Sequence, residues 1–185
     1  MLLVLSARQL REMGQNSVSA QLYLSVDCTR DAIDVLIEAG DWKKARKIAQ
    51  ELVPNYYAKV ETMYRDWLRS EGRADQLADV DLGGALELLA QQGQWDQCLQ
   101  RAQRHGVELL HKYVALYATE LIKQQRTAAA LQLFTQHGAP AKAQNLNIYR
   151  HLALEMLRHE GSGDFNTWIA LRNMFQSLVF LASVF

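Results

Sequence analysis

The sequence predicts an all-α fold, an α-solenoid of antiparallel helix pairs. Apolar residues recur every three or four positions through almost the whole chain, and no segment shows the sustained alternation of a β-strand. Only 2 prolines and 10 glycines interrupt the 185 residues. A segment of about 20 residues also occurs more than once, which is typical of stacked helical repeats.

The ends of the expected helices follow from capping residues and helix breakers. Ser17, Asp41 and Asp81 can each accept a hydrogen bond from the first amides of a helix, and Thr29 can begin one. Pro54 breaks the chain before a long amphipathic helix. In the first part of the chain the expected helices cover residues 3–13, a short helix that follows 17 and runs through 22–24, 29–39, 42–52 and the stretch after 54 that ends before 72. After a short polar segment around 77, they cover 82–92, 95–105, 109–125, 127–137, 149–158 and about 165 to the end. The short joints predict that consecutive helices lie antiparallel as neighbours.

The repeated segment is the most informative feature of the chain. Residues 32–52 read AIDVLIEAGDWKKARKIAQEL, and residues 85–105 read ALELLAQQGQWDQCLQRAQRH, which superposes on the first copy without gaps. A third, shorter copy at residues 130–138 reads ALQLFTQHG. The copies lie about 50 residues apart, the size of a unit made from two or three helices.

Each residue of the shared glycine–x–tryptophan motif has a predicted structural role. Glycine after the first helix adopts the left-handed conformation that ends it, and tryptophan two positions later opens the second helix and fills the gap between the pair. We therefore expect Trp95→Ala to cost about 3–5 kcal/mol by leaving a cavity. The predicted structural residues are Gly40, Trp42, Gly93, Trp95 and Gly138.

Charge and cysteine content argue against several classes of protein. The 20 basic and 20 acidic residues cancel, so no summed field attracts nucleic acid or an anionic membrane. Cys28 and Cys98 form no disulfide framework and are expected to be free thiols in a reducing, intracellular compartment. The apolar stretches at residues 1–5 and 177–185 are shorter than the about 20 residues of a membrane span.

No pattern in the sequence indicates catalysis or a bound cofactor. Phosphate-binding glycine loops, a nucleophile elbow and zinc-binding HExxH or CxxC motifs are all missing. His151 and His159 could share a helix face but have no further ligands, and His105 and His137 suit helix C-termini. We therefore predict a chain that is not an enzyme and has no catalytic, cofactor-binding or metal-binding residues.

Three side-chain clusters have a structural and a functional interpretation. Four aromatic residues (Tyr56, Tyr57, Tyr64 and Trp67) could stack on nucleic acid, but their helical spacing favours the solenoid core. Asp79 and Asp81 lie near helix starts, where carboxylates cap amides. The basic residues on the second helix of the first copy form either a solvated face or a docking patch for an acidic partner; they are Lys43, Lys44, Arg46 and Lys47.

Residues from about 6 to 174 resemble the C-terminal helical-repeat region of the intraflagellar transport protein 172 family. The strongest matches are GQWDQCL at 93–99, LHKYVALYA at 110–118 and HGAPAKAQNLNIY at 137–149. That family has N-terminal WD40 propellers followed by a tetratricopeptide-like solenoid, and belongs to the intraflagellar transport B complex. The resemblance implies a non-enzymatic scaffold in cilium assembly, with other transport subunits or ciliary cargo proteins as partners. It implies a location in the cilium, at the axoneme and ciliary base, and in the cytoplasm.

The chain departs from that family in two ways. It has no propellers, and the apolar tail at residues 176–185 differs from the continuation of the family pattern. We expect tetratricopeptide-like repeats over residues 1–160 and a short linker with a terminal helix, a truncated solenoid, over 161–185. The tail suggests a fragment or alternative product with an apolar surface at each end. Alternative interpretations are a vesicle-coat-like solenoid, a peptide-binding tetratricopeptide adaptor and a helical-bundle enzyme.

Overall fold

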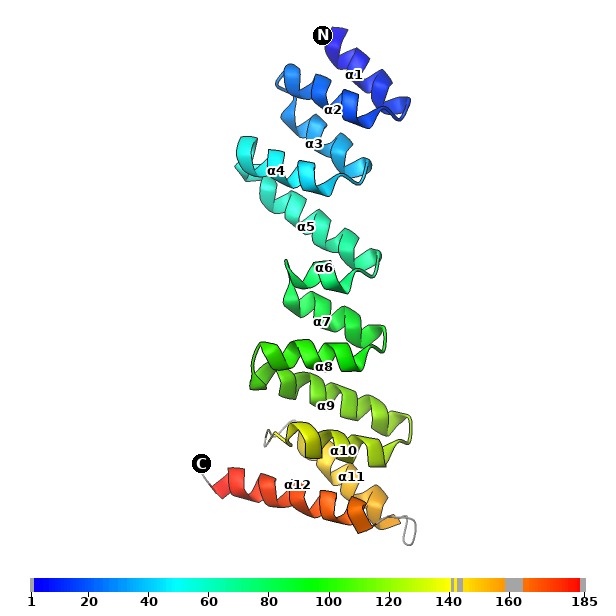
Figure 1. Cartoon of the computed structure of the whole chain (residues 1–185), viewed down its shortest axis with the longest axis vertical. Helices are drawn as coiled ribbons and strands as arrows, with labels where there is room; N and C mark the ends of the chain where they lie inside the picture. The colour runs from blue at the N-terminus through cyan, green and yellow to red at the C-terminus, as the bar shows by residue number, and fades with distance from the viewer. Residues whose placement is uncertain (1, 141, 143–144, 159–164, 184–185) are drawn as a thin grey trace. The chain divides into compact units, whose positions relative to one another are not determined.

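The computed structural model describes residues 2–140, 142, 145–158 and 165–183, and all of its regular structure is helical (Figure 1). The chain divides into two compact units, Met1–Ala85 and Leu86–Phe185. The first unit contains α1 (Leu2–Glu12), α2 (Asn16–Ser25), α3 (Thr29–Glu38), α4 (Trp42–Leu52), α5 (Pro54–Ser70) and α6 (Ala74–Ala78). Helix α7 (Leu82–Gln91) contains the boundary, and the second unit continues with α8 (Trp95–Arg104), α9 (Val107–Lys123), α10 (Thr127–His137), α11 (Leu146–Arg158) and α12 (Phe165–Ser183).

Local sequence signals determine where most of these helices begin and end. Gly40 and Gly93 have φ angles of 74° and 73°, which residues with a β-carbon adopt only at a cost. At each glycine the next amide donates back across the turn, Asp41 N to Leu36 O and Gln94 N to Leu89 O, both at 2.9 Å. This pair of turns ends α3 and α7, as the repeat predicts.

Two of the predicted N-caps are confirmed and one is wrong. Asp41 Oδ1 accepts from Lys44 N at 3.2 Å, and Asp81 Oδ1 accepts from Gly84 N at 3.0 Å. Ser17, in contrast, lies inside α2, which begins at Asn16 after an uncapped Gln15. The polar segment around Leu77 is the short helix α6, because Leu77 is buried and anchors it.

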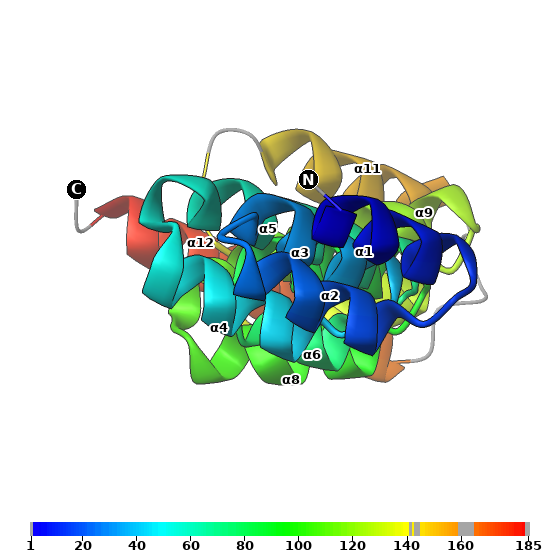
Figure 2. The same ribbon diagram turned by 90° about the horizontal axis from the view of Figure 1, so that it is seen from above.

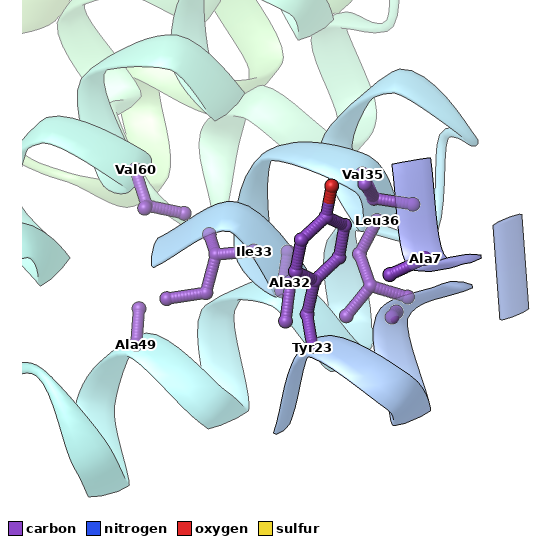
Figure 3. Close-up of a cluster of buried hydrophobic side chains, with 10 residues drawn as sticks. Ala7, Tyr23, Ala32, Ile33, Val35, Leu36, Ala49 and Val60 are labelled. Atoms are coloured by element: carbon purple, nitrogen blue, oxygen red, sulfur yellow. The ribbon is translucent and has the colours of Figure 1, made fainter. Parts of the chain in front are cut away.

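The core of the first unit is formed by small and branched side chains that face one another across consecutive helices. Each helix from α1 to α5 packs on the next, and the chain reverses direction at each turn (Figure 1). Ile33 of α3 lies on the side of Tyr23 that faces Ala49 of α4, and Leu36 of α3 lies on the side that faces Ala7 of α1 (Figure 3). Alanine at the contact positions lets the helices approach closely, so one contiguous core runs through the unit.

The three sequence copies have the same pattern of burial. The first alanine of each copy is fully buried (Ala32, Ala85 and Ala130). The apolar residues one, three and four positions later are also buried in every copy; they are Ile33, Val35, Leu36, Leu86, Leu88, Leu89, Leu131, Leu133 and Phe134. Each of the three helices therefore buries the same set of positions of the repeat. The predicted all-α helical-repeat solenoid fold is confirmed within each unit.

The second unit departs from the regular repeat after its third copy. Gly138 has a φ of 85°, but Pro140 stands where the earlier copies have tryptophan, and no helix begins there. Helix α11 starts at Leu146 and contacts both α9 and α10, whereas α12 packs extensively against α10. The view along the long axis shows α11 beside α9 (Figure 2).

Candidate protein-binding surfaces

Trp42 of the first copy lies at the centre of an aromatic cluster. Its side chain is only 7% exposed, and its ring centroid lies 5.5 Å from that of Tyr64 and 5.3 Å from that of Trp67. The guanidinium of Arg46 lies 4.6 Å from the Tyr64 ring centroid, and that of Arg73 lies 4.7 Å from the Trp67 ring centroid. The rings pack on one another and the two arginines lie over ring faces, so this cluster joins α4 to α5.

The other two tyrosines of the predicted aromatic group also serve the fold. Tyr56 and Tyr57 are half-buried and pack against the core of the first unit. The Tyr56 hydroxyl donates to Asp34 Oδ1 at 2.9 Å, and burial together with this bond raises the pKa of Tyr56. The core interpretation of the four aromatic residues is therefore supported, and their rings form no free stacking platform.

Trp95 of the second copy is more exposed than the sequence predicts. It is half-buried, and its ring stacks on Tyr117 of α9 at 4.7 Å between centroids with 13° between the planes. Position 98 of the same helix is fully buried, and Cys98 there donates to Leu86 O at 3.5 Å. Burial raises the pKa of the Cys98 thiol to about 11, so at neutral pH it is protonated. Both cysteines are free, and Cys28 is half-buried.

Gly138 ends the first helix of the third copy beside a histidine of the neighbouring helix. His111 Nε2 lies 3.2 Å from His137 O, which links α9 to the last turn of α10. His105 follows the last turn of α8, and His151 is exposed on α11. His159 lies outside the described residues, as do Gly161, Ser162 and Gly163 of the predicted linker. The described histidines, cysteines and carboxylates include no group of three or more placed to hold a metal ion.

The basic residues of α4 are largely neutralised by carboxylates of the same unit. Lys44 Nζ lies 2.7 Å from Asp41 Oδ2, and Lys47 Nζ lies 3.9 Å from Glu51 Oε1. Arg46 forms two hydrogen bonds with Glu61 of α5, which raise the pKa of Arg46. Lys43 remains exposed to solvent. This pattern supports the solvated-face interpretation of the cluster, because only one of its four charges has no ion pair in the described structure.

The acidic pair divides between two helices. Asp81 caps α7, and its other oxygen lies 3.7 Å from Arg69 Nη2 of α5. Asp79 is exposed at the end of α6. The prediction that these carboxylates lie at helix starts is therefore confirmed for Asp81 and wrong for Asp79, which follows the C-terminal end of α6.

Large apolar side chains are exposed on α1 and α12. On α12 the exposed fraction is 76% for Phe165 and 68% for Val179, while Leu171 and Met174 of the same helix are buried. We call the exposed apolar residues of this helix the α12 face: Phe165, Trp168, Ile169, Phe175 and Val179. On α1 the exposed apolar residues include Leu2, Leu3 and Leu5. Several large exposed apolar side chains on one helix make that helix a candidate site of protein contact.

A groove of about 880 Å³ lies between α9 and the start of α11. The groove is bounded on one side by α9 and on the other by Lys142, Asn145 and Ile148. None of its residues belonged to the predicted structural motif.

The chain has close relatives among known proteins. It is 43% identical over 173 residues to the intraflagellar transport protein 172 homolog of Rattus norvegicus, a match that covers 92% of this chain. The homolog of Danio rerio is 40% identical over 169 residues, and intraflagellar transport protein 172 of Chlamydomonas reinhardtii is 30% identical over 180 residues.

The resemblance to intraflagellar transport protein 172 is confirmed. The chain spans about a tenth of the length of these relatives, since the match covers 10% of the rat homolog. No family model matches the sequence. Among the helices that the structure describes, none has the length and apolar character needed to cross a membrane.

Proposed function

We propose that the chain is a non-enzymatic scaffold segment of the intraflagellar transport B complex and supports cilium assembly through protein–protein contacts. The similarity to intraflagellar transport proteins over about nine-tenths of the chain supports the transport role. Aromatic rings and charged side chains contact one another between α4 and α5 and hold these helices together. This structural use of the side chains supports a scaffold.

The α12 face is the observation that carries the contact function. A soluble chain rarely leaves five large apolar side chains exposed along one helix unless another protein covers them. Helix α10 already covers the opposite side of α12, so the face remains available for a partner. We propose that other intraflagellar transport subunits are the partners, and that the chain acts in the cilium.

The proposed organisation has tetratricopeptide-like repeats over residues 1–160, with residues 161–185 contributing the terminal helix that displays the contact face. The common burial of the three repeat copies supports the first part. The packing of α12 on α10 gives the terminal helix a fixed position within the second unit.

Recovery of transport subunits from ciliated cells tests this function. We expect the tagged chain to co-purify with intraflagellar transport B subunits identified by mass spectrometry. The double variant Phe165→Glu/Ile169→Glu should reduce their recovery at least about tenfold, because buried charge without a partner strongly opposes association. Gln176→Glu adds a charge at an exposed polar position of the same helix and should leave recovery unchanged. If the wild-type chain recovers no transport subunit, the proposed function is wrong.

A peptide-binding adaptor is the second candidate function. The groove on α9 favours it, because the groove combines apolar walls with lysine and asparagine side chains. In this candidate the scaffold would also capture a segment of a partner protein.

A further inference from the structure

The groove on α9 arises where the third repeat copy departs from the first two. In the first copy tryptophan opens a second helix directly after the glycine, but Pro140 has no amide hydrogen and no helix begins there. The chain turns instead, and three groups donate to Pro140 O: the Tyr149 hydroxyl at 2.8 Å, Lys142 N at 2.8 Å and Asn145 Nδ2 at 3.5 Å. This network fixes the start of α11 beside α9 and leaves the groove between them.

Side chains of α11 hold this arrangement in place. Tyr149 and Leu152 are buried, and the Tyr149 ring meets Phe134 of α10 edge to face at 5.1 Å between centroids. Burial raises the pKa of Tyr149 to about 12, so its hydroxyl remains a donor at every physiological pH. The wall formed by the start of α11 is therefore anchored by packing and by hydrogen bonds.

The groove presents apolar surface that the fold leaves uncovered. Leu116 of α9 is 47% exposed and Val107 is 64% exposed, although the opposite side of the same helix is buried. Ile148 provides apolar surface on the facing wall. Apolar side chains on both walls suit the side chains of an inserted peptide.

The charged groups of the groove are not neutralised within the described structure. Lys112 on α9 and Lys142 on the opposite wall have no carboxylate within ion-pair distance among the described residues. The Lys112 ammonium instead lies 5.2 Å from the Tyr113 ring centroid. This contrasts with Lys44 and Lys47 on α4, which both pair with carboxylates of their own unit. Among the described lining residues Glu108 is the only carboxylate, so lysines outnumber carboxylates there.

We propose that the groove between α9 and the start of α11 binds a short peptide segment of a partner protein that carries both acidic and leucine-like side chains. Lys112 and Lys142 face the acidic groups, while Leu116, Val107 and Ile148 contact the apolar ones. The inference rests on the proposed protein-contact function and names the chemistry of one partner segment.

Binding of defined peptides to the purified full chain tests the proposal. The probe is a fluorescein-labelled peptide of alternating glutamate and leucine, and fluorescence anisotropy measures its dissociation constant. Lys112→Glu and Lys142→Glu should each weaken binding about tenfold or more, because the new carboxylate repels the glutamates of the peptide that the lysine attracts. Leu116→Ser should also weaken binding by removing an apolar contact. Thermal unfolding of each variant verifies that the fold is retained.

Control probes and a control variant separate this site from unspecific attraction. Lys43→Glu makes the same charge change at an exposed position of the first unit and should leave peptide affinity unchanged. A lysine–leucine peptide and a glutamate–serine peptide should bind at least about tenfold more weakly than the glutamate–leucine peptide.

Three results would overturn the proposal. They are no saturable binding of the glutamate–leucine peptide, equal weakening by Lys43→Glu, and preferential binding of a single-stranded oligothymidine to the groove. Because the assay uses the purified chain alone, such a result leaves the co-purification of transport subunits unaffected. Failure of co-purification with peptide binding intact would instead overturn the proposed function alone.

Discussion

Two turns between helices have a residue other than glycine in the left-handed conformation. Asp27 and Gln125 have φ angles of 62° and 61°, which are left-handed values that glycine adopts at Gly40 and Gly93. The backbone hydrogen bonds are also the same, with Cys28 N donating to Tyr23 O at 2.9 Å and Arg126 N donating to Leu121 O at 2.8 Å. A residue with a β-carbon costs about 1 kcal/mol more than glycine in this conformation.

Replacing Gln125 by glycine should stabilise the chain. We expect Gln125→Gly to raise the free energy of unfolding by about 0.5–1 kcal/mol, because the left-handed strain is removed. The neighbouring Gln124 has a φ of −81°, so Gln124→Gly gains no such relief and should destabilise the chain through added backbone entropy. Urea denaturation followed by circular dichroism measures both variants. A lower free energy of unfolding for Gln125→Gly would contradict this account.

The two tryptophans of the repeat should differ in their contribution to stability. Trp42→Ala removes a buried ring that touches two other aromatic rings, and should cost about 3–5 kcal/mol. Trp95→Ala should cost about 2 kcal/mol, less than the sequence alone suggests, because its half-buried ring loses mainly one stacking contact. Trp42→Phe retains an aromatic ring and removes an indole N–H that has no hydrogen-bond partner among the described residues, so it should cost less than Trp42→Ala. Equal losses for the two alanine variants in thermal or urea unfolding would contradict this order.

The limits of individual helices follow from the local sequence, whereas the choice of the helix that each one packs against does not. Most expected limits lie within a few residues of the observed ones; α4 and α10 match at both ends. Apolar periodicity, capping aspartates and glycine turns act within a few residues, so they can be read directly from the chain. The N-cap prediction at Ser17 was wrong because a serine side chain can also lie within a helix. The packing of α12 on α10 could not be predicted, since no local signal at residues 138–145 specifies which later helix completes the pair.

The features of the candidate sites also divide into those that follow from nearby residues and those that depend on residues distant in sequence. The burial of the residues after Ala32, Ala85 and Ala130 follows from the repeated apolar pattern. The pairing of Arg46 with Glu61, and the lack of an ion pair at the lysines of the α9 groove among the described residues, depend on residues that are distant in sequence. Such contacts are determined by packing between helices, so the groove had no signal in the sequence beyond the proline in place of tryptophan.

At the scale of the whole molecule, charge is balanced and the exposed apolar surface is concentrated on particular helices. The 20 basic and 20 acidic residues leave no net repulsion between copies of the chain at neutral pH. Exposed leucines on α1 and the α12 face therefore have little electrostatic protection against association.

The isolated chain should self-associate as its concentration rises. We expect light scattering to show an apparent mass that increases with concentration, because the α12 face is removed from water when two copies meet. Phe165→Glu/Val179→Glu should shift the chain toward the monomer, whereas Gln176→Glu should not. A wild-type chain that remains monomeric at high concentration would show that these apolar residues do not drive association.

The sequence by itself determined the all-helical class, the repeat copies, most helix limits and the resemblance to intraflagellar transport proteins, because these depend on patterns within short stretches of chain. Only the tertiary structure decided that Trp42 is buried while Trp95 is half-buried, and that α12 completes the packing of α10. It also decided that the lysines of the α9 groove have no ion pair within the part of the chain that is described. These features depend on which distant side chains meet, and equivalent positions in two repeats can meet different neighbours.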